Sequence, residues 1–249
     1  MAIAARLGVC CGADTEGLWG PGRRVPGYMS TATDEVWESI PSHRLALADQ
    51  LEPLSDSQAN SASWCEGWRV RDVLGHLVYL AESSRSSILL DGLRSGTPNR
   101  TLARAAHRLG ERSVPELCER LRRSADGRFR VPGAPVAVGL CEVVVHGNDA
   151  LRPIGSAFEV VPDDLRPLLD TYRRLARLSF RTTAPLLGSR GRVPRTLRIH
   201  LVATDIDWSF GEGPEVRGKA VDLVLLLANR SRVLPSLSGE GTKVLAQPR

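Results

Sequence analysis

The stretch Trp68-Arg69-Val70-Arg71-Asp72-Val73-Leu74-Gly75-His76-Leu77, continued by Val78-Tyr79-Leu80-Ala81, decides how this chain folds. Its apolar residues recur at i, i+3, i+4, i+7, i+8 and i+11, which forms one stripe of an α-helix. They are Val70, Val73, Leu74, Leu77, Val78 and Ala81. Asp72 occupies the first turn, where a negative charge suits the helix dipole. The stretch therefore predicts an amphipathic helix, with His76 beside its apolar stripe.

Similar patterns on both sides predict further helices joined by short loops. They cover about residues 33–54 with a bend near Pro41, 102–125 with a break near Gly110, 135–151, and a stretch that follows Pro162. After the break, Pro115 suits the first turn of the restarted helix. Residues 29–188 are therefore predicted to form an up-and-down bundle of four or five helices.

The pattern changes after a connector rich in Gly, Arg and Pro at residues 188–194. Residues 197–201 alternate between apolar and polar, which predicts a strand, and 207–210 predict a second strand before a turn at 211–214. An apolar helix is expected at 219–230, and 242–246 are expected to return as an edge strand. Residues 195–249 are thus predicted to form a small α/β domain, which makes the fold class α plus α/β.

Composition is that of an ordinary globular protein, with 42% hydrophobic and 24% charged residues. No apolar run approaches the ~18–20 residues that cross a bilayer, so no membrane span is expected. Residues 1–28 contain glycine-rich breaks without periodicity, and we interpret them as a disordered N-terminal extension. The body of the chain has three cysteines and no C-x-x-C motif, which argues against a disulfide framework and favours a reducing, cytoplasmic location.

Positive charge concentrates in residues 163–198, which hold nine arginines and three aspartates within a chain of net charge +5. A solvated basic helix face followed by an arginine-rich connector explains this charge, and a site for an acidic small molecule is an alternative. Nucleic-acid binding is not expected, because aromatic interleaving and recognised reading motifs are missing from the sequence. Phosphate-loop, dinucleotide and serine-hydrolase motifs are missing too.

A group of polar residues offers metal chemistry. Glu142, His146 and Asp149 are spaced i, i+4 and i+7, so they project from one stripe of the 135–151 helix. His76 is the best third ligand if its helix packs beside that stripe. Two imidazoles and one carboxylate bind catalytic divalent metals and leave a coordination position open. By spacing alone, a hydrogen-bonded pair at the edge of a packed face is the more common outcome for Glu and His at i, i+4.

Local context adds a family resemblance. Trp68–Leu77 resembles the W-x-V-R-D-x-x-x-H-L signature of the mycothiol-dependent maleylpyruvate isomerase family, a branch of the DinB-like metal-binding bundles. Glu142–Asp149 matches that family's E-x-x-x-H-G-x-D segment. The C-terminal part of the chain resembles the family's small C-terminal domain. The residues that match its pattern are Ala203-Thr204-Asp205, Trp208, Gly213-Pro214, Gly218 and 220–230. The resemblance covers residues 29–249.

The resemblance implies a zinc-type ion held by His76, Glu142 and His146, with mycothiol or a similar low-molecular-weight thiol as cosubstrate. A thiolate stabilised by the ion would serve cis–trans isomerisation, or thiol transfer, on a small anionic electrophile. Asp149 would orient a ligand imidazole, with a plain charge on the helix surface as the alternative. Arg230 would pair with a substrate carboxylate, although Asn229 precedes it where the family commonly has glycine.

Two alternatives stay open. The chain would be a catalytically degenerate bundle that binds partners through residues 163–198, or an Fe(II) enzyme with the same ligand set. A binding module would show salt-dependent association without thiol-dependent turnover. The expected assembly is a monomer or a homodimer.

Overall fold

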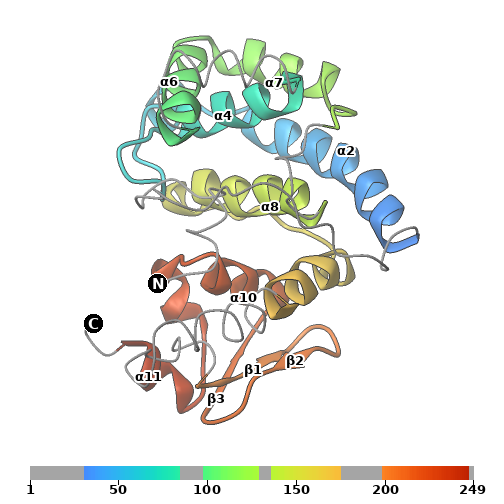
Figure 1. Ribbon diagram of the computed structural model, residues 1–249. Coiled ribbons are helices and arrows are strands. Elements are labelled where there is room, and N and C mark those ends of the chain that lie inside the picture. Colours follow the sequence, from blue (N-terminus) through green and yellow to red (C-terminus); the bar gives the residue numbers. More distant parts are fainter. Residues whose placement is uncertain (1–30, 85–97, 129–135, 175–197, 247–249) are drawn as a thin grey trace. The chain divides into compact units, whose positions relative to one another are not determined.

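A computed structural model describes residues 31–84, 98–128, 136–174 and 198–246 (Figure 1). Their contacts divide the chain into two compact units, with a boundary between Glu159 and Val160. Residues 160–174, which we assigned to the bundle from their helical pattern, cluster with the C-terminal unit. The predicted N-terminal extension at 1–28 lies outside the described residues.

The first unit is helical. Its elements are α2 (Thr31–Leu51), α3 (Asp56–Ala59), α4 (Val70–Glu82), α6 (Pro98–Gly110), α7 (Val114–Arg123), α8 (Ala137–Leu151) and the 3-10 turn η1 (Arg152–Ile154). Helix α4 packs against α6, α7 and α8, while α2 packs against α7 and α8 (Figure 1). Pro41 lies inside α2, which continues through it. The apolar stripe predicted for α4 is buried along its length.

Local chemistry explains where these helices begin. The Ser113 side chain accepts a hydrogen bond from the Glu116 backbone N–H and caps α7, whose first turn also holds a proline. At the start of α4, the Asp72 carboxylate accepts both the backbone N–H and the guanidinium of Arg69. The side chain of Asp72 is therefore a buried cap as well as a favourable charge at the helix dipole.

Helices α4 and α6 approach each other backbone to backbone. A Cβ added at Gly75 would lie 2.7 Å from the carbonyl oxygen of Ala106 and 2.9 Å from the nitrogen of Gly110. Only a glycine fits there, because real Cβ atoms do not approach backbone atoms so closely. This contact holds α4, and with it His76, in a fixed position within the unit.

Helix α8 is the most thoroughly buried element of the helical unit, as its nearly continuous apolar sequence predicts. Gly147 lets the ring of Phe158 lie against the helix, since a Cβ at this position would be 2.9 Å from that ring. Asn148 is buried and serves the fold. It donates to the carbonyl oxygens of Val144 and Phe158, and its own oxygen accepts from Arg152.

The C-terminal unit contains a three-stranded sheet in the order β2-β1-β3. Strand β1 (His200–Ala203) pairs antiparallel with β2 (Ser209–Phe210) and parallel with β3 (Glu215–Gly218). Helix α10 (Ala220–Leu227) contacts β1, and the unit also holds η2 (Pro162–Leu165), η5 (Ser231–Ser236) and α11 (Gly241–Ala246). The predicted α plus α/β fold class is confirmed.

One local prediction in this unit was wrong, and one strand was missed. Residues 242–246 are not an edge strand but belong to α11, and β3 was not foreseen. Ser238 already occupies the open edge of β3, where it exchanges two backbone hydrogen bonds with Arg217. Gly239 then adopts a left-handed φ of 98°, and Thr242 N–H bonds to its carbonyl, so the chain turns into a helix.

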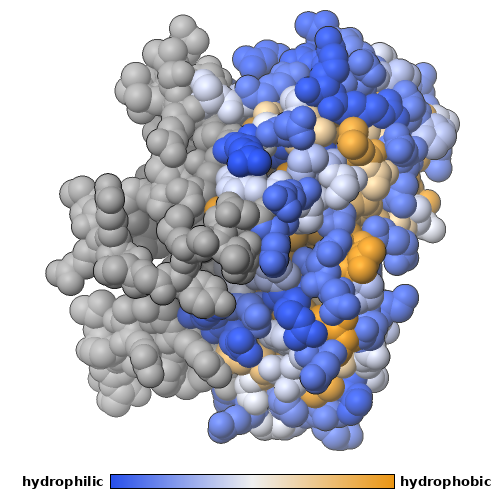
Figure 2. Space-filling view, turned by 90° about the vertical axis from the view of Figure 1, so that its right-hand side faces the viewer, coloured by the Kyte–Doolittle hydropathy of each residue, from blue (hydrophilic) through white to orange (hydrophobic). Residues whose placement is uncertain are grey.

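The visible surface is mainly polar. On the face in Figure 2, hydrophilic side chains dominate and apolar ones gather in small separate patches. Two partly buried arginines are paired with carboxylates: Arg122 bonds to Asp49 and Glu52, and Arg120 bonds to Glu82. Among the helices of the described residues, none has the length and apolarity needed to cross a bilayer.

Candidate metal centre

The packing of α4 on α8 brings the three predicted ligands together. Nε2 of His76 lies 3.1 Å from Oε2 of Glu142, and Nε2 of His146 lies 3.1 Å from the same oxygen. The two imidazole rings meet edge to face, with centroids 4.8 Å apart. Both histidines are buried, and the Glu142 side chain is 13% exposed. All three side chains are therefore largely shielded from solvent.

These separations suit a metal ion. Zinc bonds nitrogen and carboxylate oxygen at ~2.0–2.2 Å, so neighbouring ligand atoms of a tetrahedron lie about 3.3 Å apart. The observed separations of 3.1 Å to Glu142 are close to that value. In the described part of the chain, Nε2 of His146 has no hydrogen-bond partner of acceptable geometry, although it faces Glu142. A buried nitrogen of this kind is an available ligand atom.

The other nitrogen of His146 is engaged. Its Nδ1 lies 3.0 Å from Oδ2 of Asp149, one turn further along α8. A carboxylate only accepts, so Nδ1 carries a hydrogen and donates it, and Nε2 is the nitrogen that can bind a metal when the ion displaces its proton. Asp149 is fully buried, so this carboxylate is not a helix-surface charge.

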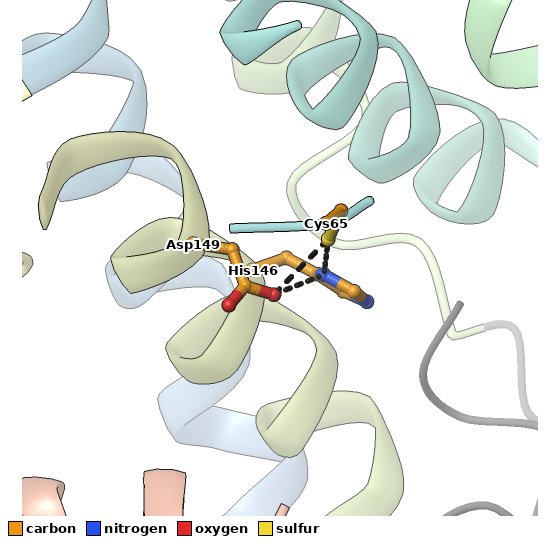
Figure 3. A group of neighbouring side chains, drawn as sticks. All are labelled: Cys65, His146 and Asp149. Atoms are coloured by element: carbon orange, nitrogen blue, oxygen red, sulfur yellow. Dashed lines mark hydrogen bonds and ion pairs between the residues drawn. The ribbon is translucent and has the colours of Figure 1, made fainter. Parts of the chain in front are cut away.

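Cys65 joins the same cluster, although its position in the sequence predicts no role at the site. Its Sγ lies 3.2 Å from Oδ2 of Asp149 and 3.5 Å from Nδ1 of His146 (Figure 3). The sequence placed Cys65 just before the Trp68 motif, but offered no sign of a contact with residues more than 80 positions away.

Trp68 supports the other imidazole. Its ring meets the His76 ring edge to face, with centroids 5.3 Å apart. It also lies 6.0 Å from the ring of His107, which is on α6. Trp68 is buried and fills the space beside the site, so it packs against a candidate ligand.

Burial and pairing shift the protonation of the metal-free group. Burial raises the pKa of Glu142, but hydrogen bonds to His146 and His76 outweigh it and bring the pKa to about 2. Burial lowers the pKa of His76, and Glu142 offsets this only in part. Burial also opposes the charge on His146, yet Cys65, Asp149 and Glu142 together raise its pKa well above its usual range. The carboxylate is therefore anionic at neutral pH.

Arg230, the predicted substrate-binding residue, lies in the C-terminal unit. Its backbone N–H bonds to the carbonyl of Leu225 and its Nη1 donates to the carbonyl of Ala228 at 3.1 Å. Asn229 before it has a φ of 66°, a left-handed conformation that glycine adopts freely and asparagine tolerates. The asparagine thus adopts the left-handed conformation that a glycine at this helix end would also allow. A role for Arg230 in substrate binding stays a prediction.

The chain resembles known proteins both in sequence and in fold. The family model described as the mycothiol maleylpyruvate isomerase N-terminal domain matches residues 42–151, a range that includes His76, Glu142 and His146. The match confirms the resemblance inferred from the motifs.

Two solved structures share the fold. The crystal structure of a mycothiol-dependent maleylpyruvate isomerase has a TM-score of 0.55 and 16% identity, covering 87% of this chain and 96% of its own. A mutant of that enzyme with one histidine changed to alanine has a TM-score of 0.54 and 15% identity, with the same coverage. Such identities show a common fold. No curated protein matches this chain significantly.

Proposed function

We propose that this chain is a metal-dependent thiol enzyme. The match of residues 42–151 to the mycothiol maleylpyruvate isomerase N-terminal domain supports this proposal. It would use mycothiol or a similar low-molecular-weight thiol to isomerise, or to transfer the thiol to, a small anionic electrophile. One observation carries the proposal: two buried imidazole nitrogens lie 3.1 Å from a single carboxylate oxygen.

His76, Glu142 and His146 would hold the ion. Zinc suits two nitrogen donors and one carboxylate oxygen, and three protein ligands leave one position for the cosubstrate. A bound divalent ion lowers the pKa of a coordinated thiol, so that the thiolate nucleophile is available at neutral pH.

The protein groups prepare this site before any ligand arrives. Glu142 contributes a permanent negative charge, since its pKa is about 2. Asp149 holds the His146 ring so that Nε2 faces Glu142. Burial of both imidazoles keeps bulk water away from the ligand atoms, which strengthens every charge interaction in the site.

Arg230 is our candidate for recognition of the anionic substrate. A guanidinium presents parallel N–H donors that match a carboxylate, and no other side chain offers this fork. The resemblance of the C-terminal unit to the family pattern supports the assignment. In this proposal Arg230 contacts substrate, while the three ligands and Asp149 prepare the nucleophile.

Metal analysis of the freshly purified protein, combined with a thiol-dependent assay, tests the proposal. We expect about one divalent ion per chain, and turnover of maleylpyruvate or a related anionic electrophile only when the thiol is present. His146→Ala should lose both the ion and turnover. His107→Ala is the matched control, because this histidine is half exposed and outside the ligand group.

Full metal content in His146→Ala would overturn the ligand assignment. Bound iron, with loss of activity in air, would instead favour an Fe(II) enzyme built on the same ligands. Salt-dependent association without thiol-dependent turnover would favour a binding module and contradict the enzyme.

A further inference from the structure

The loop that precedes α4 is held by hydrogen bonds among its own residues. Ala62 and Arg69 form an antiparallel bridge across it. Ser63 N–H donates to the carbonyl of Trp68 at 2.9 Å, and Trp68 N–H donates to the carbonyl of Cys65 at 3.1 Å. The Ser63 hydroxyl accepts the Cys65 N–H at 3.1 Å. Both backbone groups of Cys65 are therefore bonded within the loop, and its side chain has a defined direction.

The same loop is joined to the end of α8. Trp64 N–H donates to the backbone carbonyl of Asp149 at 2.9 Å. Four residues after Asp149 stands Pro153, which has no N–H, so the helix cannot satisfy this carbonyl in the usual way. Trp64 supplies the missing donor and holds the loop against α8.

Cys65, the residue after Trp64, contacts the side chain of the same aspartate. Sγ of Cys65 lies 3.2 Å from Oδ2 of Asp149, the oxygen that accepts from Nδ1 of His146 at 3.0 Å (Figure 3). A carboxylate only accepts, so the thiol is the donor in this contact. Oδ2 thus receives two donors from different segments, which limits rotation of the carboxylate. All three residues are buried, where an unmade hydrogen bond is costly.

We propose that Cys65 is a positioning residue of the metal centre: its thiol holds Asp149 in the orientation that aims Nε2 of His146 at the ion. The inference rests on the proposed metal site and extends it to a residue outside the ligand set. His76 is held differently: its Nδ1 has no hydrogen-bond partner among the described residues, and its ring packs against Trp68. The orientation of the His146 ring is therefore linked to Cys65 through Asp149.

A competing role for Cys65 is direct metal binding. Cys65, His146 and Asp149 each offer a ligand atom, and these atoms lie within 4.8 Å of one another. An ion there would take both the thiol proton and the Nδ1 proton, and His146 would have to bridge two ions. The experiment below distinguishes this role from positioning.

The test compares Cys65→Ala, Cys65→Ser and Cys118→Ala. Cys118 is a matched control, since it is a buried cysteine of the same unit outside the ligand group. Zinc affinity is measured by competition with a chelator, and site geometry by the visible absorption of Co²⁺ in place of zinc. Cys65→Ala should weaken zinc binding by about three- to tenfold, the effect of one lost hydrogen bond. Cys65→Ser keeps a donor and should recover most of this loss, whereas Cys118→Ala should bind as the wild type does.

A second comparison uses Asp149→Asn as background. If Cys65 acts through Asp149, adding Cys65→Ala to that variant should change zinc affinity by less than about twofold, because coupled residues are not additive. A general loss of stability would not produce this pattern of affinities. It would also leave the Co²⁺ spectrum of the folded protein unchanged.

Three results would overturn the inference. Equal affinity and spectrum in Cys65→Ala and wild type would remove the positioning role and leave the proposed function intact. Two ions per chain, with a sulfur-to-cobalt charge-transfer band lost in Cys65→Ala, would make Cys65 a ligand. A wild type that binds no ion would reject the proposed function and this inference together.

Discussion

Replacing Glu142 by glutamine tests the electrostatics of the site and the metal assignment at once. Glutamine keeps the shape of the side chain and resembles the protonated acid. The pKa of Glu142 falls from 4.5 to about 2 in the folded protein because of its two imidazole partners. At ~1.36 kcal/mol per pKa unit, that fall is equivalent to about 3 kcal/mol of stability at neutral pH. Glu142→Gln should therefore destabilise the metal-free protein by up to about 3 kcal/mol.

The pH dependence of the free energy of unfolding tests the direction of this effect. A carboxylate whose pKa is lowered by folding stabilises the protein above its unfolded pKa, and this contribution is lost as the pH falls through the folded value. The difference in free energy of unfolding between wild type and Glu142→Gln should thus be largest above pH 4.5 and should shrink as the pH falls towards 2. Urea unfolding at several pH values measures it. Glu119→Gln is the control, since its carboxylate is 60% exposed and its contact with Arg123 is long, at 3.7 Å.

The same variant should lose metal stabilisation. An ion that binds only the folded protein adds about 4 kcal/mol when its free concentration is 1,000 times Kd. Wild type should gain this stability with zinc, and Glu142→Gln should gain little at the same concentration. Equal gains in both proteins would refute Glu142 as a ligand. Equal stability of the metal-free proteins at pH 7 would refute the electrostatic argument.

Three further predictions follow from the structure. Gly147→Ala should destabilise the protein by about 1–3 kcal/mol, because its Cβ would be 2.9 Å from the Phe158 ring; an unchanged thermal midpoint would contradict this packing. Apparent zinc affinity should fall as the pH is lowered, because the raised pKa of His146 lets a proton compete for Nε2; chelator competition between pH 6 and 8 measures it, and a flat profile would contradict the ligand assignment. Arg230→Ala should raise KM for an anionic substrate more than for a neutral analogue while zinc content stays unchanged, and equal effects on both substrates would remove the carboxylate role.

The helices of the first unit were accessible from the sequence because their signals are local. The apolar spacing of α4, the Ser113 cap and the proline of α7 all act within one or two helical turns. The same reasoning applied to 242–246 failed. Ser238 pairs with the edge of β3, so that edge is not available to residues 242–246, which form a helix instead. This pairing is a tertiary contact that the local sequence pattern does not reveal.

The ligand set divides in the same way. Glu142 and His146 share one helical turn, so their proximity could be worked out from spacing, and the motifs identified His76 as their partner. Their meeting depends on α4 packing against α8 across 66 residues of chain.

What the sequence determined by itself is the longer helices of the first unit, the Glu/His pair and the resemblance of residues 42–151 to the mycothiol maleylpyruvate isomerase N-terminal domain. The tertiary structure alone decided that His76 reaches Glu142, that Asp149 is buried behind His146, and that Cys65 touches both. The physical reason is range: helical periodicity acts over a few residues, whereas contacts between distant segments depend on which surfaces the whole unit buries together.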